Sequence, residues 1–150
     1  MNSRDVIVGL DIGAKRIGVS RGDLEVRLAS PLPAISNDNE VMDVIISLVR
    51  EIGANLVVIG LPRDSYGSET LQSEFSRSFA ARLSEALLDA RLNVRITLQD
   101  ESLTSIAAED NLRSRKDFND KMLRDGTLDS EAAALILQDF LEGQHGTAQG

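Results

Sequence analysis

The chain has 150 residues, of which 42% are hydrophobic and 27% are charged. This length and balance are typical of one globular domain with its own core. The absence of cysteine excludes disulfides and thiolate-bound metals. No apolar run approaches the roughly 20 residues that a membrane helix needs. The polar N-terminus does not resemble a signal peptide, so we expect a cytoplasmic protein that makes no contact with membranes.

The net charge of the chain is −8. This charge argues against a nonspecific binder of nucleic acids, because phosphate affinity usually comes from Lys and Arg. An acidic protein can still hold a nucleic acid where metal ions and a local basic face supply positive charge. The charge therefore lowers the expectation of nucleic-acid binding without excluding it.

Three short strands are expected at the start of the chain. The apolar run 6–10 predicts a buried strand, and residues 17–20 and 26–29 predict two more strands joined by a turn. Two prolines in the segment 30–33 are expected to end this antiparallel meander, because proline cannot donate to a central ladder.

The rest of the chain alternates helices and strands. The expected elements are a helix at 41–52, a strand at 55–59, a helix at 69–90, a strand near the sheet edge at 94–98, and helices at 104–112 and 129–141. In the long helix, Leu71, Phe75 and Phe79 recur every fourth residue, which assigns them to the core. The polar segment 113–126 is expected to be a mobile loop. Residues 144–150 are expected to form a disordered tail after a single domain at 1–143.

This order of elements predicts the fold class. A meander followed by β-α-β crossovers gives an α/β fold with a five-stranded mixed sheet and helices on both faces. Ligands of such sheets collect beyond the carboxyl ends of the parallel strands.

Three acidic residues stand where expected elements end or begin. Asp11 follows the first strand, Glu101 follows the last strand, and Asp129 opens the final helix. Close carboxylates repel one another unless a cation lies between them, and oxygen-only ligands favour Mg²⁺ or Mn²⁺. Each residue also has an ordinary interpretation, as a turn residue, a solvated loop acid and a helix cap respectively. Spacing alone favours these ordinary interpretations.

Five segments together resemble the YqgF/RuvX family, the Holliday-junction-resolvase-like proteins. These segments are Gly-Leu-Asp-Ile-Gly-Ala-Lys-Arg-Ile-Gly-Val at 9–19, Ala-Ser-Pro-Leu at 29–32, Val-Ile-Gly-Leu-Pro at 58–62 with Gly-Ser-Glu at 67–69, Asp-Glu-Ser-Leu-Thr-Ser at 100–105, and Asp129 with Ala-Ala at 132–133 and Ile-Leu-Gln at 136–138. They span nearly the whole chain in the family's order and at similar separations.

The resemblance implies an RNase H-like fold and a nuclease whose divalent-metal ligands are Asp11, Glu101 and Asp129. Two such ions could activate a water and stabilise the leaving oxygen, and the sequence leaves open whether one or two are bound. It implies RNA as a partner, in the processing of the 5′ end of pre-16S ribosomal RNA and in association with a ribosomal subunit. A resolvase acting on structured DNA is the alternative. One departure is that Ser102 stands where the family has Arg. Serine cannot clamp a phosphate bidentately, so another arginine would have to position the substrate.

Cations near the first acid and in the central loop are candidates for substrate binding. Lys15 and Arg16 directly follow the first acid motif, and Arg63 lies in the central loop with Tyr66, an aromatic residue that could be exposed. The loop 60–68 leads into a helix N-terminus, whose free N–H groups suit a phosphate. The ordinary interpretation is that these cations are solvated and that the loop only turns the chain and caps the helix.

Two other functions remain open at this point. The Asp-x-Gly turn with a following Lys also resembles the phosphate loop of actin-like ATPases, although the chain lacks the second lobe that those proteins close on ATP. A catalytically silent RNA-binding protein of ribosome assembly is the third interpretation, and the Ser102 departure favours it. The sequence leaves open whether the protein is a monomer or a homodimer.

Overall fold

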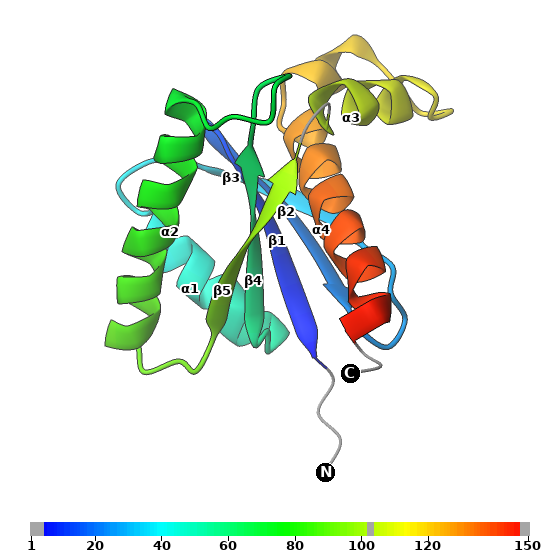
Figure 1. Ribbon diagram of the computed structural model, residues 1–150. Helices are drawn as coiled ribbons and strands as arrows, with labels where there is room; N and C mark the ends of the chain where they lie inside the picture. The colour runs from blue at the N-terminus through cyan, green and yellow to red at the C-terminus, as the bar shows by residue number, and fades with distance from the viewer. Residues whose placement is uncertain (1–4, 102–103, 148–150) are drawn as a thin grey trace.

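The computed structural model describes residues 5–101 and 104–147, which form five strands and four helices (Figure 1). The elements are β1 (Val6–Ile12), β2 (Arg16–Asp23), β3 (Ser30–Ser36), α1 (Val41–Ile52), β4 (Leu56–Pro62), α2 (Leu71–Asp89), β5 (Arg95–Glu101), α3 (Thr104–Arg113), the short 3₁₀ helix η1 (Asp120–Leu123) and α4 (Thr127–Thr147). Their order is the one predicted. Ser102, the departure from the family pattern, lies outside the described residues.

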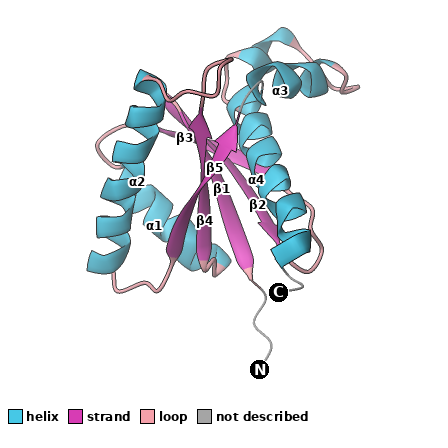
Figure 2. Cartoon of the chain, viewed as in Figure 1, coloured by secondary structure: helices cyan, strands magenta, loops and turns pink. Residues whose placement is uncertain are grey.

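The strands form one mixed sheet in the order β3-β2-β1-β4-β5. The pairs β1–β2 and β2–β3 are antiparallel, whereas β4 runs parallel to both of its neighbours. Helices α1 and α2 cover one face of the sheet and α4 covers the other (Figure 2). The predicted five-stranded sheet with helices on both faces is therefore confirmed, and so is the edge position of β5.

The predicted limits of several strands are wrong where glycine and proline were taken as breakers. No strand forms at 26–29; the third strand is β3, which contains both Pro31 and Pro33. It lies at the sheet edge, where one row of N–H groups has no ladder partner, and residues two apart present their nitrogens on the same side. Similarly, β4 continues through Gly60 to Pro62 rather than ending before them.

Large apolar side chains fill the layer between the sheet and helices α1 and α2. The fully buried members of this core include Leu10, Ile45, Ile59, Phe79 and Leu83. Helix α1 has the predicted limits and ends at Gly53 in the left-handed conformation, which glycine adopts without strain.

Two of the residues assigned to this core are not buried in it. Leu71 is 83% exposed and Phe75 is 40% exposed. The helix begins with a capping box between Thr70 and Ser73, and Ser73 and Ser76 face inward in the first turns. Ser73 donates a hydrogen bond to the carbonyl of Pro62, so this end of the helix lies close to the end of β4. Small side chains such as serine fit into that narrow space, whereas Leu or Phe would not.

Helix α4 lies on a part of the sheet that has almost no side chains. Gly18, Ser20 and Gly22 of β2 and Gly9 of β1 face it, and a Cβ atom at any of the three glycines would collide with α4 or with the atoms beside it. The Ser20 hydroxyl donates to the carbonyl of Ala133 at 2.8 Å. The helix therefore rests almost directly on the backbone of the sheet.

The last helix extends beyond both predicted ends. It begins at Thr127 rather than at residue 129, and it continues to Thr147, into the segment that was expected to be disordered. Residues 148–150 of that segment lie outside the described residues. Among the residues that the structure describes, no helix is both long enough and apolar enough to cross a membrane.

Candidate active site

The three acids lie on the α4 face of the sheet, at the end where the parallel strands finish. Asp11 is the sixth residue of β1, Glu101 is the last residue of β5, and Asp129 lies in the first turn of α4. Alternate residues of a strand point to opposite faces. Because Leu10 and Ile12 pack against α1 and α2, Asp11 between them faces α4. The topology therefore places three acids that are distant along the chain at one end of the sheet.

Gly60 provides the space between Asp11 and Glu101. Strand β4 separates β1 from β5, and neighbouring strands are about 4.8 Å apart. A side chain on β4 at this level would fill the gap, but a Cβ at Gly60 would already overlap a carboxylate oxygen of Glu101 and lie 2.5 Å from Cδ1 of Ile136. The bare backbone of Gly60 thus allows the Glu101 side chain to lie across β4 towards Asp11.

Gly18 provides the space that the backbone of Asp129 occupies. It pairs with Asp11 across the β1–β2 ladder. A Cβ at Gly18 would overlap the backbone carbonyl of Asp129. One residue further along, the backbone N–H of Val19 donates to the Ser130 hydroxyl at 3.1 Å. The first turn of α4 is thereby fixed against β2 beside the first acid.

The neighbouring acids affect the ionisation of Asp11. Burial, and to a smaller extent the charges of Glu101 and then Asp129, together raise the pKa of Asp11 from 3.8 to about 7. Burial disfavours the ionised carboxylate, and like charges add to that effect. A carboxyl group that ionises near neutral pH is typical of a site built to hold a cation or a proton.

Arg16 supplies positive charge to this cluster. Its Nε atom donates to Oδ2 of Asp129 at 3.1 Å, and each side chain is about one-third exposed, at 35% and 33%. The candidate substrate cation is therefore engaged by one of the candidate metal ligands. Among the side chains that the structure describes, no three Asp, Glu or His residues are arranged as a ready-made cation site.

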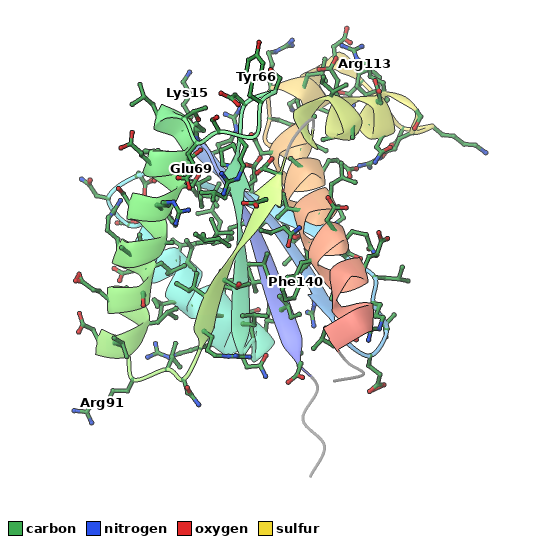
Figure 3. The ribbon with its side chains drawn as sticks, in the orientation of Figure 1. Lys15, Tyr66, Glu69, Arg91, Arg113 and Phe140 are labelled. Atoms are coloured by element: carbon green, nitrogen blue, oxygen red, sulfur yellow. The ribbon has the colours of Figure 1, made fainter. Side chains whose placement is uncertain are left out.

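Arg63 and Lys15 occupy different environments. The guanidinium of Arg63 donates to Asp100 at 3.0 Å and to the carbonyl of Gly67 at 3.2 Å, and lies 3.7 Å from Glu69. Arg63 thus joins the end of β5 to the loop after β4. Lys15 is exposed at the tip of the β1–β2 turn (Figure 3). The structure brings Arg16 into the acid cluster, places Arg63 in a network beside it, and leaves Lys15 in solvent.

The loop after β4 is braced internally and displays one aromatic ring. The Asp64 carboxylate accepts hydrogen bonds from the backbone N–H groups of Tyr66 and Ser68, both at 2.9 Å. Gly67 adopts a positive φ of 81° at the turn. Tyr66 is 91% exposed at the same end of the molecule as Lys15 and Glu69 (Figure 3). The exposure expected of Tyr66 is confirmed.

Sequence reasoning missed the small residues that shape the site. Gly18, Gly60 and Ser130 are as necessary to the arrangement as the acids, since they set how closely the elements approach. Glycine inside a predicted strand is a signal of close backbone approach. That signal was available at Gly18, but it does not say which element approaches.

The fold identifies the class of protein. The structure of Thermus thermophilus RuvC in complex with a Holliday junction substrate superimposes on this chain with a TM-score of 0.57 at 14% identity. The match covers 95% of this chain and 97% of the RuvC chain. The Fowlpox virus resolvase in complex with Holliday junction DNA gives a TM-score of 0.55 at 13% identity, covering 93% and 99%. This chain therefore has the RNase H-like fold of the RuvC-like resolvases.

The sequence identifies the family. Residues 5–143 match the model of the RuvX family, described as Holliday junction resolvase, and the chain belongs to that family. A relative from Anaeromyxobacter sp. (strain Fw109-5), named "Putative pre-16S rRNA nuclease", is 37% identical over 140 residues, covering 92% of this chain and 97% of the relative. A relative of the same name from Nitrosospira multiformis is 38% identical over 147 residues, covering 93% and 89%. The resemblance seen in the sequence is thus confirmed.

Proposed function

We propose that this protein is a nuclease that hydrolyses phosphodiester bonds in the maturation of the 5′ end of pre-16S ribosomal RNA. The observation that carries the proposal is the partly buried Asp11, whose pKa is raised by burial and by the neighbouring charges of Glu101 and Asp129. The names of the relatives support the substrate, and their match extends over nine-tenths of the chain. A cytoplasmic location follows from such a substrate.

The donor set fits a divalent metal ion. Asp11, Glu101 and Asp129 offer only carboxylate oxygens, which are the ligands that Mg²⁺ and Mn²⁺ prefer. Burial first, and then the charges of Glu101 and Asp129, raise the pKa of Asp11, and a cation bound among the three carboxylates would offset that repulsion. When bound, one or two such ions would activate water and stabilise the leaving oxygen in phosphodiester cleavage.

The other residues of the site would handle the RNA. Lys15 is free to reach a phosphate from the β1–β2 turn, because it is exposed at the end where the parallel strands finish. Arg63 would act mainly by holding the loop that follows β4, since its guanidinium already binds Asp100 and Gly67. The RNA would therefore lie across the top of β1, β4 and β5, with a ribosomal subunit as the setting and a monomer or homodimer as the active species.

The test is cleavage of a 5′-extended pre-16S RNA fragment in the presence of Mn²⁺. We expect Asp11→Asn to reduce the rate by at least about 100-fold, because even the outer partners of metal ligands are worth 10- to 100-fold. The matched control is Asp139→Asn, which removes an exposed carboxylate elsewhere on α4 and should keep the rate. Full cleavage by Asp11→Asn would eliminate this site.

A resolvase acting on branched DNA is the second candidate, because the family model is described as Holliday junction resolvase. The same two variants should then be assayed on a four-way DNA junction. Cleavage of the junction without cleavage of the RNA would replace the first proposal by the second. Metal-independent RNA binding without cleavage of either substrate would instead indicate a catalytically silent protein.

A further inference from the structure

The geometry points to Arg16 as a positioning residue that holds Asp129 apart from the other two acids and exchanges it for an RNA phosphate when a divalent cation enters the site. The inference rests on the proposed nuclease function and gives Arg16 two successive partners. It also accounts for three acids that stand at one end of the sheet but, among the side chains that the structure describes, are not arranged as a cation site.

The contact between Arg16 and Asp129 joins the start of β2 to the start of α4 beside Gly126. Arg16 is the first residue of β2 and reaches the first turn of α4 through its Nε atom, 3.1 Å from Oδ2 of Asp129. Its side chain passes over Gly126, where an added Cβ would lie 3.4 Å from Cδ of Arg16 and 2.8 Å from Ala34. Gly126 has a φ of 101°, a conformation that favours glycine. The chain thus provides a path for the guanidinium to the acid.

The three acids have different neighbours. The Glu101 carboxylate lies over Gly60, where an added Cβ would overlap it. The Asp129 carboxylate instead accepts a hydrogen bond from Arg16. A guanidinium keeps its proton at any ordinary pH, so it leaves Asp129 only when another anion replaces that carboxylate or a stronger cation displaces it.

The partner that Arg16 takes up after release follows from its chemistry. A guanidinium presents N–H groups in a planar fork that matches a phosphate as well as a carboxylate. Arg16 and Asp129 are both about one-third exposed, so a ligand can reach the contact from solvent. A cation bound by the acids would free Arg16 at the place where a scissile phosphate has to lie. Arg16 would therefore couple cation binding to RNA binding.

The experiment measures Mn²⁺ affinity by isothermal titration calorimetry in the absence of RNA. We expect Arg16→Ala to bind Mn²⁺ at least about 5-fold more tightly than the unmodified protein, at the lower end of typical coupling between two ligands. Arg16→Lys should fall between them, because it keeps the charge but loses the fork. The control is Arg115→Ala, which removes the same charge from a pair with Asp117 and Glu131 and should change the affinity less than 2-fold.

A second measurement tests the exchange to phosphate. The affinity for the 5′-extended RNA fragment is measured in Ca²⁺ with all three acids intact, and the RNA is recovered afterwards to show that it was not cleaved. Arg16→Ala should weaken this affinity while it strengthens Mn²⁺ binding in the first experiment. Structural damage would weaken both, so the opposite signs are diagnostic.

The outcomes separate this inference from the proposed function. Arg16→Ala that binds Mn²⁺ no better than the unmodified protein, while that protein cleaves RNA, would overturn the role of Arg16 and leave the nuclease proposal standing. An unmodified protein that neither binds Mn²⁺ nor cleaves either nucleic acid would overturn both. Opposite changes in Mn²⁺ and RNA affinity would support both.

Discussion

The two faces of the sheet are built on opposite principles. On one face, branched and aromatic side chains such as Leu10, Ile45 and Phe79 interlock with α1 and α2 in a thick apolar layer. On the other face, Gly18 and Ser20 bring the backbone of α4 almost against the backbone of β2. The first face gains stability from the apolar area that it buries. The second face buries less apolar area here, because glycine and serine replace large side chains. In return, α4 lies close to β2 and Asp129 is held near the strand that carries Asp11.

The two faces should respond differently to substitution, one mainly in stability and the other mainly in cleavage. Removing volume from the α1–α2 face should lower stability and leave the chemistry of the folded molecules intact. Adding volume to the α4 face should disturb the chemistry with a smaller loss of stability. Three experiments test this difference between the faces, in order of decreasing expected change in the free energy of unfolding.

Phe79→Ala should lower the free energy of unfolding by about 3–5 kcal/mol, because it removes a large buried side chain and leaves a cavity. The measurement is urea unfolding followed by circular dichroism. Leu88→Ala is the control on the same helix, since Leu88 is 72% exposed and its loss should be nearly neutral. Below its unfolding transition, Phe79→Ala should cleave RNA at the normal rate. A greatly reduced rate would contradict the expectation that the α1–α2 face affects stability and not cleavage.

Asp11 should make the metal-free protein less stable as the pH rises. Its pKa is about 7 in the folded protein and 3.8 as a free side chain, so between these values the folded state binds more protons than the unfolded state. Stability from this group is therefore complete below pH 3.8 and is lost as the pH rises to 7. The loss is at most about 4 kcal/mol, at 1.4 kcal/mol per pH unit.

The comparison that isolates this effect is Asp11→Asn in EDTA. At pH 8 the variant should be more stable than the unmodified protein, and the difference should shrink towards pH 4. Urea unfolding at both pH values measures it. Equal pH dependence in the two proteins would show that the pKa of Asp11 is not raised in the folded protein.

Gly18→Ala should cost about 1–3 kcal/mol, as over-packing usually does, because the new Cβ overlaps the carbonyl of Asp129. Cleavage should fall much further, by about 100-fold, since a shift of about 1 Å in a catalytic group has that effect. Gly143→Ala is the control in α4: a Cβ there meets nothing within 4 Å, and the variant should gain up to about 1 kcal/mol from helix propensity. Normal cleavage by Gly18→Ala would refute the role of the bare backbone.

Much of the fold was predictable because it depends on periodicity. The apolar spacing in 41–52 gave α1 its limits, and Gly53 marked its end. The failures occurred where the position in the sheet overrides a local rule. Pro31 and Pro33 are compatible with β3 because it is an edge strand, and the order of strands cannot be read from the prolines themselves.

The candidate site was predictable to the level of the backbone and no further. The position of Asp11 and Glu101 at one end of the sheet follows from the strand order, whereas that of Asp129 depends on how α4 packs on β2. The resemblance to the RuvX family is what singled out these three acids. The pairing of Arg16 with Asp129 was not predictable, because it depends on the rotamer of a long side chain and on the space over Gly126. Sequence spacing carries no information about either.

The prolines of β3 have a consequence for assembly. An exposed strand edge is a template on which the strand of another molecule can add, and the end point of that process is aggregation. Pro31 and Pro33 remove two N–H donors from this border of the sheet, so an incoming strand would find an interrupted ladder. Copies of this chain are thereby discouraged from adding to one another through β3.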